Sequence, residues 1–186
     1  MESKLQIISG VFRGRKLRLP KNARPTQNRA RIALFNMLES GIIEFGAKMS
    51  VWDTFAGSGA FGIECLSRYL DVNVLFTDVA PDSIKTVRDN LAMLNVGARA
   101  SVVHSDAIGA IAKYASNVDL FFVDSPYDMA ELGRAFVAKA ACVARSGAVL
   151  IWEQEAKYAI QPNLEKWNVL RDKTYGRARF LILQKK

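Results

Sequence analysis

Residues 51–64 constrain the fold more than any other stretch, because an apolar run leads into a glycine-rich turn and then into a helical pattern. Residues 49–52 are typical of a buried strand, and residues 60–69 carry apolar side chains at helical spacing. Between them, Gly57-Ser58-Gly59 allows a sharp turn and lets backbone N–H groups approach a ligand closely. The stretch therefore predicts the first strand–turn–helix unit of an α/β sheet, with a ligand beyond the carboxyl ends of the strands.

Two kinds of cofactor are compatible with such a turn. Residues 57–62 match the G-x-G-x-x-G pattern of dinucleotide-binding proteins, and Asp78 lies about 20 residues further on, where a ribose-binding acid is expected. S-adenosylmethionine enzymes use a similar turn and a similar acid. Asp53 favours the second group, because a carboxylate at the strand end would repel a pyrophosphate and attract a sulfonium and an ammonium. We therefore expect S-adenosylmethionine, with a dinucleotide or a ligand-free turn as alternatives.

The length of 186 residues indicates one α/β domain with at most a small appendage. No apolar run approaches the about 18 residues of a membrane span, and the first residues lack the apolar segment of a secretory signal. We therefore expect a cytoplasmic monomer that does not contact membranes. Cys65 and Cys142 are expected to be small buried residues in helices, and one histidine cannot build a metal cluster, so no metal is expected.

Positive charge is concentrated at the start of the chain. Residues 1–31 contain nine Lys or Arg and one acid, a net charge of +8, which equals the net charge of the whole sequence. The remaining residues therefore sum to zero. A block of one sign is expected for a protein that binds a polyanion, and glycines and prolines in the segment argue against an amphipathic membrane helix. We expect a nucleic-acid partner.

Within this basic block, residues 5–11 and 16–19 are predicted as short strands joined by a turn at residues 12–15. Arg13, Arg15 and Lys16 would cluster near that turn, where they can reach phosphates or bases. We divide the chain into a basic β-hairpin extension, residues 1–24, and a Rossmann-like domain, residues 25–186. A helix with Thr26 as its N-cap follows, with Arg29 and Arg31 on its more polar sides. Its apolar face is expected to comprise Ile32, Leu34, Phe35 and Leu38.

From residue 49 onward, predicted strands alternate with helices, which indicates a doubly wound and largely parallel sheet. Two final strands can pair through a turn at residues 175–177, giving an antiparallel end. The expected strands are residues 49–53, 72–77, 100–104, 118–124, 148–153, 167–172 and 178–183, and the expected helices are residues 60–69, 81–94, 107–114 and 129–144. The fold class is therefore α/β, with a seven-stranded, mostly parallel sheet.

Acidic residues stand at the ends of successive predicted strands: Asp53, Asp78, Asp106 and Asp124. A single acid in such a position is often only a helix N-cap. Four of them are better explained by a shared crevice at the carboxyl ends of the strands, where a ligand binds. Asp106 would then lie beside an adenine ring.

The segment Asp124-Ser125-Pro126-Tyr127 indicates the reaction type. It resembles the (Asp/Asn)-Pro-Pro-(Tyr/Phe) motif of S-adenosylmethionine-dependent amino-methyltransferases, with serine in place of the first proline. An exocyclic amine is a poor nucleophile, because its lone pair is delocalised into the base. The Asp124 carboxylate and the Ser125 carbonyl can accept its two N–H bonds, and Tyr127 can stack on a flipped base. A plain β-turn with Tyr127 packed on the sheet is the alternative.

The N-terminal block makes the resemblance more specific. Residues 7–17 (Ile-Ile-Ser-Gly-Val-Phe-Arg-Gly-Arg-Lys-Leu), Arg24-Pro25-Thr26, Arg29, Arg31 and residues 34–36 and 53–59 resemble the RsmD family. The resemblance covers nearly the whole chain and implies guanine-N2 methylation of bacterial 16S ribosomal RNA in the small subunit or its assembly intermediate. This sequence differs from the family at Ser125, which replaces the first proline of the motif. The family also usually has an acid at the position of Ile32 and often one at the position of Asn28.

The resemblance also implies roles for individual residues. Phe55, Gly57, Ser58 and Gly59 would line the cofactor, Asp78 would hold its ribose and Asp106 its adenine edge, while Thr26 would lie near the mouth of the site. Together with Asp53, these form the expected cofactor site, and residues 124–127 form the expected catalytic site. The residues expected to bind RNA are Arg13, Arg15, Lys16, Arg24, Arg29 and Arg31.

Other functions are compatible with the same residues. The motif at residues 124–127 also serves DNA adenine, DNA cytosine and protein glutamine methylation, so a DNA or other amino-methyltransferase is one alternative. Ser125 and Ile32 are compatible with an RNA-binding assembly factor that has lost catalysis. A dinucleotide-dependent oxidoreductase is the third alternative.

Overall fold

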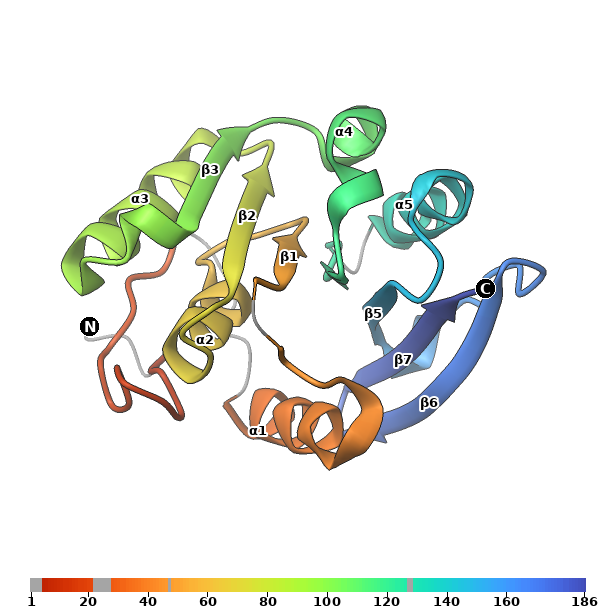
Figure 1. Ribbon diagram of the computed structural model, residues 1–186, viewed down its shortest axis with the longest axis horizontal. Helices are drawn as coiled ribbons and strands as arrows, with labels where there is room; N and C mark the ends of the chain where they lie inside the picture. Colours follow the sequence, from red (N-terminus) through yellow and green to blue (C-terminus); the bar gives the residue numbers. More distant parts are fainter. Residues whose placement is uncertain (1–4, 22–27, 47, 127–128) are drawn as a thin grey trace.

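A seven-stranded sheet with the order β3-β2-β1-β4-β5-β7-β6 forms the centre of the computed structural model, which describes residues 5–21, 28–46, 48–126 and 129–186 (Figure 1). The first five strands in chain order run parallel, and β7 pairs antiparallel with both β5 and β6. The strands are β1 Ser50–Asp53, β2 Asn73–Asp78, β3 Ala100–His104, β4 Leu120–Val123, β5 Val149–Glu155, β6 Trp167–Tyr175 and β7 Ala178–Lys185.

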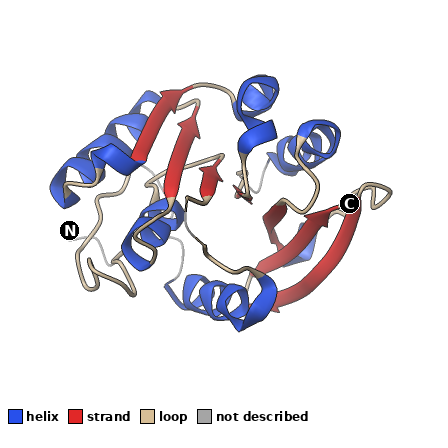
Figure 2. Ribbon diagram, in the orientation of Figure 1, coloured by secondary structure: helices blue, strands red, loops and turns tan. Residues whose placement is uncertain are grey.

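Helices cover both faces of the sheet (Figure 2). Side chains of α1, α2 and α3 pack in one buried cluster, and those of α4 and α5 pack in a second cluster on the opposite face. The α-helices are α1 Asn28–Met37, α2 Ala60–Arg68, α3 Pro81–Leu94, α4 Ala107–Tyr114 and α5 Ala130–Val143, with a π-helical turn at Leu38–Ile42 and short 3₁₀ turns at Gly97–Arg99, Ala115–Asn117 and Ala156–Tyr158.

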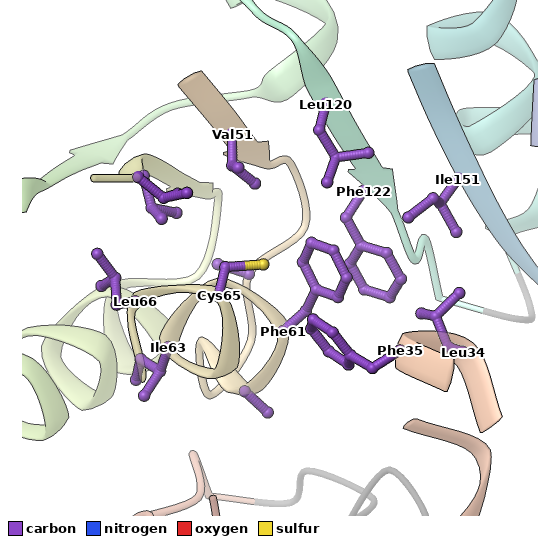
Figure 3. Packing of buried hydrophobic residues seen from close by; sticks show 14 of the residues in the cluster. Leu34, Phe35, Val51, Phe61, Ile63, Cys65, Leu66, Leu120, Phe122 and Ile151 are labelled. Carbon is purple, nitrogen blue, oxygen red and sulfur yellow. The ribbon is translucent and has the colours of Figure 1, made fainter. Parts of the chain in front are cut away.

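The alternation of side chains along each strand explains the two clusters. In β1, Val51 belongs to the cluster with α2, while Trp52 belongs to the cluster with α5. On the α1 side, the rings of Phe35, Phe61 and Phe122 stack in series, with centroid distances of 5.3 and 4.0 Å (Figure 3). Each fully buried side chain of this size stabilises the fold by about 1.5–3 kcal/mol. The stack thus fixes α1 and α2 beside the end of β4.

The sheet and its helices confirm the fold class expected from the sequence. β3, α3 and α4 have the predicted bounds, and the other strands and helices differ by a few residues at their ends. The apolar face expected for α1 is correct for Leu34, Phe35 and Leu38, but Ile32 is exposed. Cys65 is buried as expected, whereas Cys142 is exposed on α5, contrary to the expectation.

Residues 5–21 do not form the two regular strands that the sequence predicts. They fold back on themselves, with an isolated antiparallel bridge between Gln6 and Lys16 and a backbone bond from Ile7 N to Arg15 O of 3.0 Å. Between these positions the backbone turns toward α2, where the N–H of Val11 donates to the carbonyl of Ser67 at 2.9 Å. The segment is therefore a short, irregular hairpin, with further bonds from Leu17 N to Leu5 O at 2.9 Å and from Gly14 N to Ile7 O at 2.8 Å, and its turn is bonded to α2.

The described residues contain neither a helix long and apolar enough to cross a membrane nor a group of three or more potential metal ligands.

Candidate functional site

The glycine-rich turn lies between the end of β1 and the start of α2, as the sequence predicts. Gly57 and Gly59 have positive φ angles of 54° and 76°. A Cβ on Gly59 would lie 3.2 Å from Val87 and 3.3 Å from Ile63, so both the backbone conformation and the space require glycine there. On Gly57 a Cβ would meet no atom within 4 Å. Gly57 therefore leaves an open approach to the backbone of the turn.

Asp53 is at the end of β1 and is buried, with 2% of its surface exposed. Its Oδ2 accepts the N–H of Gly62 in the first turn of α2 at 3.0 Å. Burial raises the pKa of Asp53 well above its usual value, the bond from Gly62 lowers it in part, and the nearby acids Asp124 and Asp78 raise it further. Burial thus favours the neutral form of Asp53, and a cation near the end of β1 would favour its charged form.

Asp78 connects the end of β2 to the glycine-rich turn. Its Oδ2 accepts the N–H of Gly57 at 2.8 Å, and its Oδ1 accepts the N–H of Ala80 at 2.8 Å. A carboxylate has about four acceptor positions, so this half-buried group retains capacity for hydroxyl donors. Phe55 lies half-buried nearby, with its ring 6.3 Å from that of Phe136 on α5. These residues fit an adenosyl group with a ribose diol.

Asp106 begins α4 and is exposed. Its side chain accepts the N–H groups of Ile108 and Gly109 at 3.1 and 2.9 Å. It is therefore an N-cap of the kind that satisfies free donors at a helix start. Its predicted contact with an adenine edge stays a prediction.

The segment after β4 brings Asp124 and Ser125 to the same edge of the sheet as the glycine-rich turn. Asp124 is half-buried, and burial is the one cause found, among the described residues, for the shift of its pKa. Its removal from water raises the pKa of this carboxyl to about 7. Ser125 is 4% exposed, and Pro126 is exposed and accepts the N–H of Met129 at 2.8 Å. Tyr127 lies outside the described residues.

A small pocket adjoins Ser125 and Pro126 at the carboxyl end of β5. It is also lined by Trp152, Gln154 and Tyr158, none of which is among the site residues expected from the sequence. Gln154 is 5% exposed, and its Oε1 accepts the N–H of Ile160 at 2.7 Å. The pairing of β5 with β4 could have pointed to these lining residues, because it places the end of β5 beside the motif at residues 124–127.

The basic residues of the N-terminal block fall into two groups. Arg13, Arg15, Lys16 and Arg29 are exposed, as an RNA-binding role requires. Arg31, however, is 4% exposed and does not lie on a polar face of α1. Arg24 and Thr26 lie outside the described residues.

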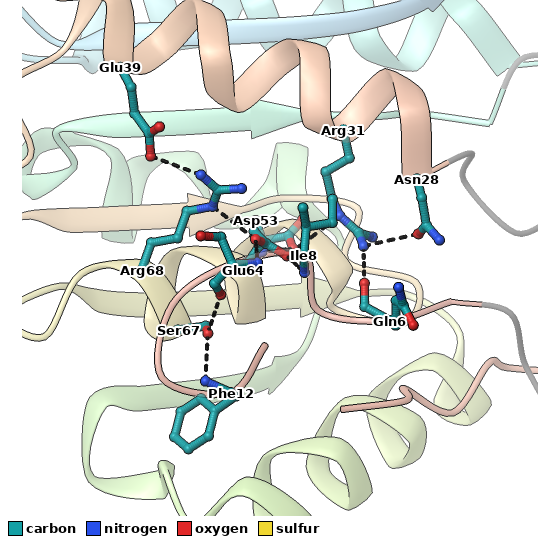
Figure 4. A network of polar contacts seen from close by, with 12 residues as sticks. Gln6, Ile8, Phe12, Asn28, Arg31, Glu39, Asp53, Glu64, Ser67 and Arg68 are labelled. Carbon is teal, nitrogen blue, oxygen red and sulfur yellow. Dashed lines mark hydrogen bonds and ion pairs between the residues drawn. The ribbon is translucent and has the colours of Figure 1, made fainter. Parts of the chain in front are cut away.

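Arg31 is buried because it belongs to an ionic network (Figure 4). Its Nη2 donates to the carbonyl of Gln6 and, at 3.2 Å, to Oδ1 of Asn28. Its Nε lies 3.8 Å from Oε2 of Glu64, which is fully buried on α2. Burial lowers the pKa of Arg31, and the charge of Glu64 opposes this effect. Arg31 thus holds the N-terminal segment against α2, and its predicted contact with RNA is not supported by this placement.

Glu64 is the centre of this network. Its two oxygens accept the backbone N–H groups of Ile8 and Ser9 at 2.8 and 2.9 Å, and Arg68 donates to Oε1 at 2.8 Å (Figure 4). The hydroxyl of Ser67 donates to the carbonyl of Ser9 at 2.6 Å. Because the charge of Glu64 is balanced and its oxygens are hydrogen-bonded, the helix can bury a carboxylate at this position.

The fold and the site together define a class I methyltransferase, with a glycine-rich turn after β1 and acids at the ends of β1, β2 and β4. Solved structures agree. The putative methyltransferase yhhF from Escherichia coli has a TM-score of 0.84 and 28% identity, with 99% of each chain covered. The putative methylase HI0767 from Haemophilus influenzae has a TM-score of 0.78 and 25% identity, with 98% of this chain and 99% of that chain covered. Such a fold implies a cofactor of the S-adenosylmethionine type.

The family follows from the sequence comparisons. Residues 5–184 match the family described as "Conserved hypothetical protein 95", and the chain belongs to this family, which is the RsmD family. The chain is 32% identical over 184 residues to the "Ribosomal RNA small subunit methyltransferase D" of Escherichia coli (strain K12), covering 97% of this chain and 90% of that protein.

Proposed function

We propose that this protein transfers a methyl group from S-adenosylmethionine to the exocyclic N2 amine of a guanine in 16S ribosomal RNA, within the small subunit or its assembly intermediate. The observation that carries the proposal is the position of Asp124, Ser125 and Pro126 beside the glycine-rich turn in a chain of the RsmD family. The names of its relatives support an RNA of the small subunit as the substrate. We also propose that it acts as a monomer in the cytoplasm.

The residues around the turn would bind the cofactor. The open space at Gly57 would let the cofactor approach the backbone of the turn, Asp78 has acceptor capacity for a ribose diol, and Phe55 offers an apolar surface. A positive charge bound at this edge of the sheet would favour the charged form of Asp53. When bound, S-adenosylmethionine supplies a methyl group activated by its sulfonium.

The segment after β4 would hold the amine. The Asp124 carboxylate and the Ser125 carbonyl accept its N–H bonds, which directs the nitrogen lone pair away from the ring and toward the methyl donor. A carboxyl with a pKa of about 7 is also well matched to accept the proton that the amine loses near neutral pH. General base catalysis of this kind contributes about 10²–10⁴-fold, and orientation contributes further.

The decisive experiment measures transfer of a labelled methyl group to small ribosomal subunits that lack the modification, followed by digestion to nucleosides. We expect N2-methylguanosine with the wild type and a loss of about 100-fold or more with Asp124→Ala. The exposed Asp71→Ala is the matched control and should retain activity. A methylated adenine, cytosine or protein would support one of the other amino-methyltransferases. RNA binding without any transfer by the wild type would support a non-catalytic assembly factor.

A further inference from the structure

The basic N-terminal segment, residues 5–21, is attached to the two helices that flank the glycine-rich turn. Glu64 on α2 holds the backbone of Ile8 and Ser9 near the start of the segment. Near its end, the N–H of Lys21 donates to Oδ2 of Asp82 on α3 at 2.6 Å. Between these two points lies a third attachment, which also reaches the turn itself.

That third attachment is Asn90, a fully buried residue of α3 with 0% exposure. Its Oδ1 accepts the N–H of Arg18 at 2.8 Å, and its Nδ2 donates to the carbonyl of Arg18 at 3.1 Å. The same Nδ2 donates to the carbonyl of Ser58 at 3.0 Å. One amide thus joins the basic segment to the central residue of the glycine-rich turn.

The geometry of the amide makes this a specific connection. Because Oδ1 must face the N–H of Arg18, the assignment of oxygen and nitrogen is fixed, and both hydrogens of Nδ2 have acceptors. A buried amide is costly unless its hydrogen bonds are made. Here they are made with two chain segments far apart in sequence, so the position of one segment depends on the position of the other.

We propose that Asn90 is a positioning residue that makes the basic segment and the glycine-rich turn a single unit, so that an adenosyl cofactor bound at the turn orders the segment that contacts RNA. This inference rests on the proposed cofactor site. Because the two binding equilibria are linked, RNA that fixes the segment would strengthen cofactor binding by the same factor by which the cofactor strengthens RNA binding. Cofactor and RNA would therefore bind cooperatively, without a large change of fold.

A neighbouring contact provides a matched control. The guanidinium of Arg18 donates to Oδ2 of Asp89 at 3.0 Å, and this carboxylate also pairs with Lys85. The pair is exposed and holds only the side chain of Arg18. Asp89→Asn therefore weakens an attachment of the same residue to the same helix, without altering the hydrogen bonds to Ser58.

The experiment measures amide hydrogen exchange of the full-length protein with and without saturating S-adenosylhomocysteine, read in residues 15–19. In the wild type and in Asp89→Asn, we expect the ligand to slow exchange of the Arg18 amide by about fivefold or more. In Asn90→Leu and Asn90→Asp, we expect this ligand effect to be lost, although the ligand still protects the turn. Asn90→Asp retains an acceptor for Arg18 but removes both donors, so it tests the connection to Ser58 directly.

A merely structural role for Asn90 would lower thermal stability in both variants and leave the ligand effect on residues 15–19 intact, which would overturn the inference. The inference would also be overturned if, in the wild type, the ligand slowed exchange in the turn but not at Arg18. This outcome does not depend on whether a variant folds. If the wild type methylates small subunits but the ligand does not slow exchange of the Arg18 amide, this inference is contradicted and the proposed function is supported. Coupling without methyl transfer contradicts the proposed function and supports the inference. A wild type that does not bind S-adenosylhomocysteine overturns both.

Discussion

Asp124 is the residue whose protonation most directly controls the proposed chemistry. Burial raises its pKa to about 7, so it is half-ionised near neutral pH. Only the ionised form can take up the proton that the amine loses. We expect kcat/KM for the cofactor, which reports groups of the free enzyme, to rise as the pH increases to about 7 and then to level off. Asp124→Asn should remove this rise. A wild-type profile that is flat between about pH 5 and 9 would contradict the assignment.

The raised pKa of Asp124 also determines how the free energy of unfolding should depend on pH. A carboxyl whose pKa is higher in the folded state than in the unfolded state stabilises the fold while protonated, and this contribution is lost as the pH rises through about 7. Asp124→Asn, which is neutral at every pH, should therefore have a higher free energy of unfolding than the wild type above pH 7, by a few kcal/mol. The difference should vanish near about pH 4. Urea unfolding at both pH values measures it, with the exposed Asp71→Asn as a control that should show no such trend.

Among single residues, the sequence correctly placed Asp78 and Ser125 at strand ends and the glycines in the turn, because strand ends and positive φ angles leave local signals, while the roles of these residues stay predictions. It was wrong about the side of α1 on which Arg31 lies. Arginine is usually exposed, and its burial depends on Glu64, which is 33 positions away and has no local signature. The partners of Asn90 were likewise invisible, because they depend on how α3 packs against two distant segments.

Among the elements, α5 must pack closely against the catalytic segment. A Cβ on Gly133 would lie 2.6 Å from Nε1 of Trp152 and 2.7 Å from Oγ of Ser125. Gly133→Ala should therefore displace either α5 or Ser125, lowering stability by about 1–3 kcal/mol and reducing methyl transfer. Gly97→Ala is the control, because its Cβ would meet nothing within 4 Å. Thermal unfolding and the transfer assay would show whether the effect is specific to Gly133.

The elements of the sheet were predictable because apolar runs, Pro81 and the alternation of strands and helices are local patterns. The N-terminal segment does fold back as an antiparallel hairpin, but the two regular strands expected there do not form, although its residues favour strands. The N–H groups of Ile8, Ser9 and Val11 bond to α2 instead of to a partner strand. Local propensity cannot reveal that competitor. The boundary between extension and domain at residue 24 stays a prediction, since it lies outside the described residues.

For the whole molecule, the uneven charge distribution determines how RNA affinity should depend on salt. Arg13, Arg15 and Lys16 are exposed in the segment that Glu64 and Asn90 hold in place. Each phosphate contact contributes about 0.7–0.9 to the slope of log affinity against log salt concentration. Replacing all three by glutamine should reduce the steepness of that slope by about 2–3 and weaken RNA binding at low salt.

The matched control for this experiment removes the same charge from the other end of the chain, with Lys157→Gln, Lys166→Gln and Lys173→Gln, three exposed residues far from the N-terminal segment in sequence. Both triple variants change the net charge from +8 to +5, as three positive charges are lost. If general attraction between a basic protein and RNA dominated, the two slopes would fall equally. If the N-terminal segment contacts phosphates directly, only its variant should show the less steep slope. Equal slopes would therefore contradict the segment as the RNA-binding surface.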